Sequence, residues 1–196
     1  MKVLLDAGHG IETPGKRSPD GLFREYKYCR ELATLVKERL QKLGIDVIYI
    51  CEGVETDTKL KDRCKLINAI CRKEGARNCV SISIHNNAAT SDGNWHDASG
   101  WSVYVSLNAS EYSKRLASLL FTEAKKAKIL GNRRTPSEGY KAKNLAMCRD
   151  TNCPAVLIEN MFQDNKQDVA WMLTEEGKQT LVDVIVNGVK KYIQSF

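Results

Sequence analysis

The sequence lacks any run of about 20 apolar residues, the length that a helix needs to cross a bilayer. The apolar run near the N-terminus ends after a few residues, at Asp6 and two glycines, so it does not have the form of a signal peptide. We therefore expect no membrane insertion. We also expect synthesis in the cytoplasm, with release or export by another route if the protein acts outside.

Paired cysteine motifs are also missing. The seven cysteines include no C-x-x-C, which argues against a zinc ribbon or a thioredoxin-like site. We expect reduced and mostly buried thiols. The net charge of +6 favours a polyanionic partner, but the basic residues do not cluster with aromatic ones. The sequence thus gives no support for nucleic-acid binding, and it contains no signal for an oligomeric state.

Predicted strands and helices alternate along the chain. Strands are expected at 3–5, 46–50, 80–84, 101–107 and 154–158, with a further short strand at 144–149. Helices are expected at 23–43, 58–73, 110–128, 164–173 and 175–193. This order predicts one α/β domain over residues 1–196, with a twisted, mixed but mostly parallel sheet flanked by helices on both faces. No linker or separate wall-binding domain is expected.

The first two helices have clear apolar stripes at helical spacing. In the first helix the stripe is Glu25, Tyr28, Cys29, Leu32, Val36, Leu40 and Leu43. In the second it is Leu60, Cys64, Ile67 and Cys71, with Thr58 as the expected N-cap. Glu25 stands out because a carboxylate on a core-facing stripe needs a partner.

Ionisable residues follow three apolar strands: His9 shortly after the first, His85 after the third, and Glu159 after the strand at 154–158. The carboxyl ends of parallel strands meet at one edge of a sheet, so these side chains are expected to converge there. Glu25, at the start of the first helix, is the fourth candidate.

Two histidines and one carboxylate are a common ligand set for catalytic zinc, and a second carboxylate beside the fourth position can act as general base. The residues alone leave open which glutamate binds and which takes the proton. Simpler interpretations also exist: each histidine could be structural, Glu159 could cap a turn, and Glu25 could pair with Arg24 or Lys27. His96 is expected to be a surface residue.

The segment 10–17 fits G-x-x-x-x-G-K and raises the alternative of a nucleotide-binding loop. A P-loop continues with Ser or Thr and runs directly into a helix. Arg17 occupies that position, and Pro19 and Gly21 delay the helix, so the pattern argues against this alternative.

In this order and context the four residues resemble the zinc-dependent N-acetylmuramoyl-L-alanine amidases of the amidase-3 type. The resemblance rests on Leu5-Asp6-Ala7-Gly8-His9-Gly10, Glu25, Ser83-Ile84-His85-Asn86-Asn87-Ala88 and Pro154-Ala155-Val156-Leu157-Ile158-Glu159-Asn160. It implies one Zn²⁺ per chain bound by His9, Glu25 and His85, with Glu159 as the catalytic carboxylate. The implied reaction is hydrolysis of the amide between N-acetylmuramic acid and the L-alanine of the peptidoglycan stem peptide.

The chain departs from the commonest family pattern at Asn86, where a small residue is frequent, and at Asn160-Met161-Phe162, where a glycine usually follows the carboxylate. The loop 15–21 resembles that of a subgroup found in Bacteroides-type bacteria and their phages. Two other features suggest an endolysin: no export signal and no attached wall-binding domain are expected. A bacterial wall-remodelling enzyme, and an accessory protein that keeps the fold without the chemistry, remain alternatives. Asn87, Asn160 and Arg17 are candidates for binding substrate because they neighbour the site residues, with a solvated side chain as the alternative for Arg17.

Overall fold

A six-stranded sheet organises the chain in a computed structural model that describes residues 1–196. The strands are β1 (Lys2–Ala7), β2 (Asp46–Tyr49), β3 (Cys79–Asn87), β4 (Ser102–Val105), β5 (Lys141–Ala142) and β6 (Ala155–Phe162). The helices are α1 (Glu25–Lys42), α2 (Leu60–Glu74), α3 (Glu111–Lys126), α4 (Ala146–Arg149), α5 (Lys166–Met172) and α6 (Glu175–Ile193), with a 3₁₀ turn at Ala76–Asn78.

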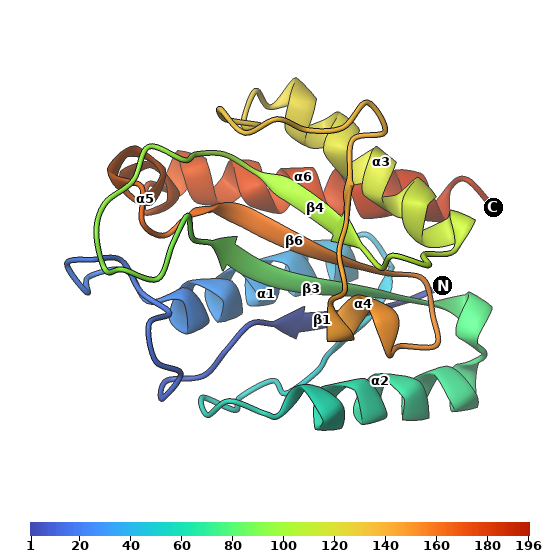
Figure 1. Cartoon of the computed structure of the whole chain (residues 1–196). Helices are drawn as coiled ribbons and strands as arrows, with labels where there is room; N and C mark the ends of the chain where they lie inside the picture. The colour runs from blue at the N-terminus through green and yellow to red at the C-terminus, as the bar shows by residue number, and fades with distance from the viewer.

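The strands lie in the order β2-β1-β3-β6-β4-β5. β2, β1, β3 and β6 run parallel, β4 pairs antiparallel with β6, and β5 runs parallel to β4. The predicted mixed, mostly parallel sheet is confirmed. In Figure 1 the arrowheads of β1 and β3 point to the left, while both chain termini lie at the right-hand end.

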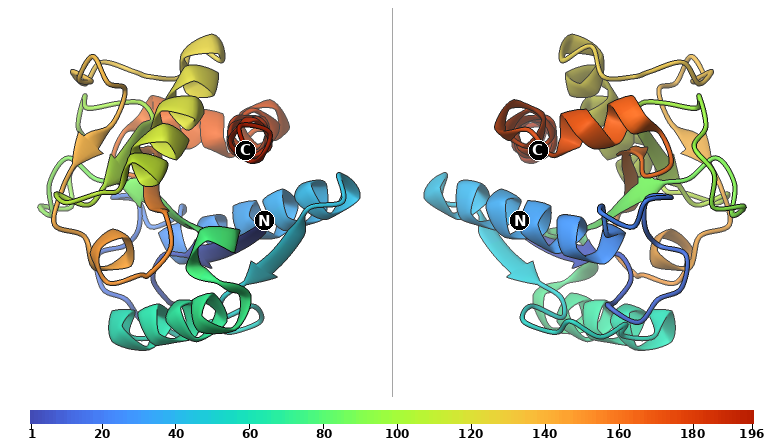
Figure 2. Two further views of the ribbon diagram at one scale, coloured as in Figure 1. Left: turned by 90° about the vertical axis from the view of Figure 1, so that its right-hand side faces the viewer. Right: turned by 90° about the vertical axis from the view of Figure 1, so that its left-hand side faces the viewer.

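Helices cover both faces of the sheet, as predicted. α1, α3 and α6 share the larger apolar core with alternate residues of β1, β3 and β6, including Leu5, Ile82 and Ile158. α2 and α4 form a smaller core on the other face, where Ile67 and Met147 pack with Leu4. Figure 2 shows α2 on the opposite side of the sheet from α3 and α6. β1 and β6 contain successive apolar residues because both of their faces are covered, whereas in β3 the buried residues Ser81 and Ser83 alternate with apolar ones.

The predicted helices are confirmed, with starts and ends shifted by at most two residues. Six of the seven cysteines are buried, and none forms a disulfide, as expected. Two residues assigned to apolar stripes are wrong: Leu43 ends α1 with 49% exposure, and Leu60 begins α2 with 52% exposure. Thr58 is not the N-cap of α2, because Lys59 occupies that position without a side-chain bond.

The strand predicted at 144–149 is wrong. Ala146–Arg149 forms the helical turn α4, which buries Met147 against α2, and Cys64 Sγ lies 3.8 Å from Met147 Sδ. Met147 and Cys148 are therefore the buried residues of a helical turn and not of a strand. β3 and β6 are also longer than predicted, since each continues past the ionisable residue that was expected to end it.

No helix combines the length and apolar composition that crossing a membrane would require.

Replacing Ile67 with alanine tests the packing of α2 on the sheet. Ile67 is fully buried in the smaller core, so Ile67→Ala is expected to lower the free energy of unfolding by about 2–5 kcal/mol. The matched control is Leu66→Ala on the same helix, where the side chain is 48% exposed and the change should be below about 1 kcal/mol. Equal effects in urea titrations of the two variants would contradict the packing described.

Candidate metal centre

Three side chains from separate segments meet at the carboxyl edge of the sheet. His9 lies in the loop after β1, Glu25 is the first residue of α1, and His85 is in β3. Their donor atoms all lie within 4.8 Å of one another. Glu25 Oε1 is 3.5 Å from His9 Nε2 and 3.3 Å from His85 Nδ1. The sequence-based expectation that these three residues converge is thus met by the geometry.

Glu25 is completely buried. Burial alone would raise the pKa of its carboxyl group, but the hydrogen bond and charge of His85, together with His9 and Lys16, outweigh burial and keep the pKa below its usual value. The backbone N–H of Asn86 donates to Oε1 at 3.0 Å. Oε2 has no hydrogen-bond partner, and the Lys16 ammonium is 4.0 Å away. The carboxylate therefore has an unused acceptor atom inside the protein.

The two histidines differ in charge preference. Burial, with smaller contributions from His85 and Lys16, lowers the pKa of His9 to about 4 although Glu25 acts in the opposite direction. Burial also disfavours the charged form of His85, but the hydrogen bond and charge of Glu25 raise its pKa above the usual value. At neutral pH His9 is an uncharged imidazole, which leaves one ring nitrogen free to bind a metal.

The donor set fits a metal ion. In a tetrahedral zinc site with bonds of about 2.0–2.1 Å, neighbouring donor atoms are about 3.3 Å apart. The separations of 3.5 and 3.3 Å around Glu25 Oε1 match this spacing. Because a buried carboxylate with an unpartnered oxygen is costly, a cation between the three side chains would also remove an electrostatic penalty.

Glu159 lies beside this group. It is the register partner of His85 across β3 and β6, so the two side chains are on the same face of the sheet. Burial, reinforced by the charge of Glu25, raises the pKa of Glu159 to about 7, while His85, Lys16 and Lys143 act in the opposite direction. Oε2 of Glu159 has no hydrogen-bond partner. A cation at the neighbouring donor set would lower this pKa again.

The backbone at His9 is held in an unusual conformation. Its φ is +61°, in the left-handed region that costs a non-glycine residue about 1–2 kcal/mol. Its carbonyl accepts hydrogen bonds from Arg30 of α1 at 2.8 Å and Arg63 of α2 at 3.5 Å. A Cβ at Gly8 would lie 2.4 Å from the His85 ring, so the glycine allows the two histidines to approach. The glycine before His9 thus allows the backbone to pack closely against His85.

Arg63 is a residue that the sequence reasoning missed. It is almost fully buried and donates to Asp6 Oδ1 at 3.0 Å, to Asp57 Oδ1 at 2.8 Å and to the Ala7 carbonyl. Ser83 donates to the other oxygen of Asp6 at 2.5 Å. This network fixes the end of β1, from which His9 extends. A signal was present, because position 63 falls within the apolar stripe of α2, as Glu25 does in α1.

A β-bulge follows Glu159. The partners His85–Glu159 are followed by Asn87–Phe162, so β6 contains one extra residue. Met161 in this bulge has φ +65°. Here the chain departs from the family pattern noted above, with a non-glycine residue in the left-handed region close to the carboxylate.

The three residues expected to bind substrate lie in different surroundings. Arg17 is exposed and makes no side-chain hydrogen bond or ion pair, so Lys16 is the basic residue next to Glu25. Asn87 is half-buried near the end of β3. Asn160 is fully buried and donates to the His85 carbonyl at 3.2 Å, which favours a role in holding β3 and β6 together. Their binding of substrate stays a prediction.

The remaining sequence candidates lie outside this group. His96 is not part of the donor set. Its ring hydrogen-bonds with Asp92 at 2.9 Å and with Thr90. The loop that fits the P-loop pattern folds against Asp57 through Thr13, and a Cβ at Gly10 would lie 2.1 Å from the Asp57 nitrogen. No helix follows this loop directly, because α1 begins only at Glu25.

Comparisons with known proteins identify relatives of this chain. The family model described as N-acetylmuramoyl-L-alanine amidase matches residues 3–191. The chain is 28% identical over 194 residues to the probable cell wall amidase LytH of Staphylococcus epidermidis, and 27% identical over 168 residues to the endolysin of Bacillus phage SPP1. These matches cover 98% and 86% of this chain but 58% and 57% of the relatives, so the chain spans less than two thirds of their length.

Solved structures show the same fold. An N-acetylmuramoyl-L-alanine amidase of Clostridium difficile 630 matches with a TM-score of 0.84 and 27% identity, covering 99% of this chain and 97% of that one. Ami1 of Mycobacterium smegmatis matches with a TM-score of 0.83 and 20% identity, covering 100% and 98%. The second likeness concerns the fold alone.

Removing the Arg63 guanidinium tests the buried network. Arg63→Met leaves Asp6 charged and without its cation, so the free energy of unfolding is expected to fall by about 3–5 kcal/mol in denaturant titrations. The double variant Asp6→Asn/Arg63→Met should lose less than the sum of the two single changes, because the unpaired charge is gone. Arg72→Met, exposed on the same helix and unpaired, is the control and should change little. Strict additivity of the two changes would contradict the network.

Proposed function

Because this chain belongs to the N-acetylmuramoyl-L-alanine amidase family, we propose that it hydrolyses the amide bond between N-acetylmuramic acid and the L-alanine of the peptidoglycan stem peptide. The observation that carries the proposal is the meeting of His9, Glu25 and His85 next to Glu159, the register partner of His85. A donor set with an adjacent carboxylate is the arrangement that metal-assisted amide hydrolysis requires.

The metal proposed for this site is one Zn²⁺ per chain, with His9, Glu25 and His85 as its ligands. Two imidazoles and one carboxylate suit zinc, and three protein ligands leave a fourth position for water or substrate. When bound, zinc supplies a Lewis acid that polarises the scissile carbonyl and makes water more acidic. Its charge would also be matched by Glu25, whose second oxygen has no hydrogen-bond partner.

Glu159 is the proposed proton carrier. Its carboxylate takes a proton from the attacking water as the water oxygen bonds to the lactyl carbonyl carbon. The carboxyl group then gives this proton to the alanine nitrogen as the C–N bond breaks. The products are the free muramic carboxyl group and a peptide with an N-terminal alanine, so atoms and protons balance.

Other residues keep these groups in place. The Asn86 N–H holds Glu25 through Oε1, and Asn160 donates to the carbonyl of His85. Arg30 and Arg63 hold the carbonyl of His9. Each donor side chain is therefore oriented by a hydrogen bond to itself or to its own backbone, which lowers the cost of arranging the site on binding.

The proposed setting is the bacterial cell wall, in phage-type lysis or in wall remodelling. LytH is named as a probable cell wall amidase, and the SPP1 protein is an endolysin. These names support a peptidoglycan substrate outside the cytoplasm and leave both settings as parts of the proposal.

Metal analysis tests the ligand set. Zinc-reconstituted and dialysed protein is expected to retain about one zinc per chain, because three donors hold it. His85→Ala should retain much less, while the control His96→Ala should retain as much as the wild type. Failure of the wild type to retain zinc would contradict the proposal and favour an accessory protein that kept only the fold.

Glu159→Gln tests the proton carrier. The amide cannot take up the water proton, so kcat is expected to fall by about 10²–10⁴-fold while the zinc content is unchanged. Turnover is measured as newly formed N-terminal alanine on digested peptidoglycan, with the exposed Glu138→Gln as the control. Release of reducing sugars without N-terminal alanine would show that the enzyme cleaves a different bond.

A further inference from the structure

Three basic side chains near Glu159 have no acidic partner. Arg133, Lys141 and Lys143 make no ion pair and no side-chain hydrogen bond, whereas other lysines of the chain are paired, such as Lys126 and Lys191 with Glu123. The one acidic residue in the loop between Arg133 and Lys141 is Glu138, and its carboxylate accepts from Ser137. This part of the molecule therefore carries uncompensated positive charge.

The sheet places this charge beside the proposed catalytic group. Ser102 of β4 is the register partner of Glu159, and Tyr104 lies two residues further along β4. Lys141 of β5 is in turn the register partner of Tyr104. Since neighbouring strands are about 4.8 Å apart, Lys141 starts about 10 Å from the strand that carries Glu159. Paired residues point to the same face, so these side chains lie on the face of Glu159.

Both lysines lie near the aromatic ring of Tyr104. The Lys141 and Lys143 ammonium groups are 5.7 and 6.0 Å from the centre of its ring. Burial raises the pKa of Tyr104, with the neighbouring Ser102 and Asn87 side chains acting in the opposite direction, so its hydroxyl stays protonated at neutral pH. Contact with an aromatic face restrains a flexible lysine and keeps its charge above the sheet. Tyr104 is also within reach of Asn87, at the end of β3.

The positive charges act on one another. Burial lowers the pKa of Lys141, Arg133 lowers it further, and Glu159 raises it. The positive charges of Lys141 and Arg133 thus repel each other, and an anion between them would relieve the repulsion. Glu159 is the acidic group that acts on Lys141, but no carboxylate lies within 4.0 Å of these cations, which leaves them free to bind an anionic ligand.

We propose that Arg133, Lys141, Lys143 and Tyr104 form a binding surface for the carboxylates of the stem peptide. This rests on the proposed function, in which the leaving group is a peptide. Such a peptide continues from its alanine to further residues and carries carboxylates, whereas the glycan on the other side of the scissile bond offers mainly hydroxyl and acetamido groups. Positive charge next to Glu159 therefore matches the peptide side of the substrate and sets a preference for acidic over amidated peptides.

Binding is measured in the Glu159→Gln background, where no turnover disturbs the equilibrium. The probe is an N-acetylmuramyl peptide with free carboxylates and a neutral fluorophore, followed by fluorescence anisotropy on the zinc-loaded protein. Lys141→Gln/Lys143→Gln is expected to raise Kd about fivefold, because each exposed charge pair contributes a factor of roughly two to three. The same peptide with its carboxylates converted to carboxamides should bind both proteins equally.

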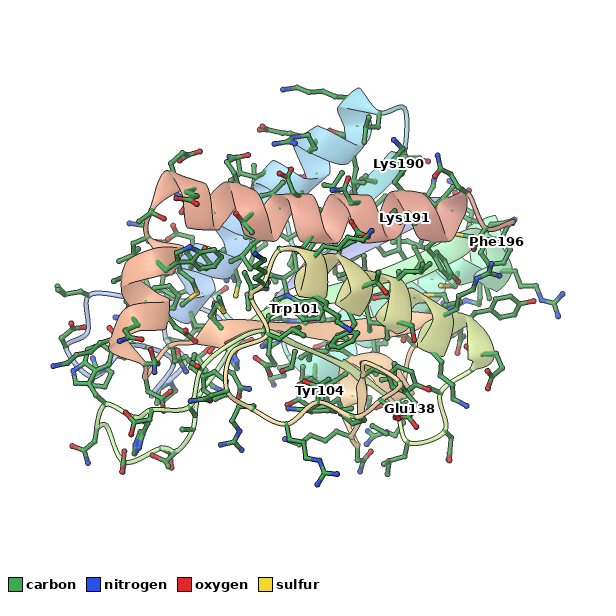
Figure 3. All side chains as sticks on the ribbon, turned by 90° about the horizontal axis from the view of Figure 1, so that it is seen from above. Trp101, Tyr104, Glu138, Lys190, Lys191 and Phe196 are labelled. Carbon is green, nitrogen blue, oxygen red and sulfur yellow. The ribbon has the colours of Figure 1, made fainter.

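Lys190→Gln is the matched control. Lys190 is an exposed, unpaired lysine on α6, and Figure 3 shows it on the opposite side of that helix from Tyr104. Its replacement changes the net charge by the same amount per residue and should leave Kd unchanged. Raising the salt concentration should remove most of the difference made by the lysine pair, because exposed charges are screened.

The outcomes separate this inference from the proposed function. Equal Kd values for the parent and the lysine-pair variant, with the acidic probe at low salt, would overturn the inference. An equal loss with the carboxamide probe would overturn it too, because the effect would not depend on carboxylates. The amidase proposal is judged separately, by the N-terminal alanine that the wild type releases.

Discussion

The register between β3 and β6 is the constraint on which the site depends. These strands are the middle of the sheet, and their pairing sets His85 directly beside Glu159. A slip of one residue would turn one of the two side chains to the other face, so the buried pattern of both strands protects the pair. The bulge at Met161 comes directly after it and lets β6 leave the register only once Glu159 is in place.

Some of the charged side chains around this pair are neutralised within the protein and others are not. Asp6 and Arg63 satisfy each other inside the protein, with Ser83 and Asp57 completing their hydrogen bonds. Glu25 is different, because one of its oxygens has no hydrogen-bond partner. The lysines beside Tyr104 likewise have no ion-pair partner. A bound cation would stabilise the buried carboxylate, and a bound anion would stabilise the basic side chains. The groups that the fold leaves unmatched are those that face the proposed ligands, which agrees with the general finding that local imbalance gathers at functional sites.

The sequence was sufficient to predict the fold class and the convergence of His9, Glu25 and His85 beside Glu159, because the signals are local. Apolar strands end near ionisable residues, and Glu25 interrupts an apolar stripe. The extensions of β3 and β6 could not be predicted, since Asn86, Asn87 and Asn160 are residues typical of loops and pair only through contacts between distant segments. Arg63 was missed because a charged residue on a helix is usually solvated. Met147 and Cys148 form a helical turn only because α2 provides a surface for them.

The carbonyl of His9 receives hydrogen bonds from Arg30 on α1 and Arg63 on α2, helices that lie on opposite faces of the sheet. One backbone oxygen is thus tied to both outer layers of the molecule. The left-handed turn at His9 gains both bonds only when both helices have docked on the sheet. The loop that carries His9 therefore orders together with both layers, and a change that loosens either helix also loosens this turn.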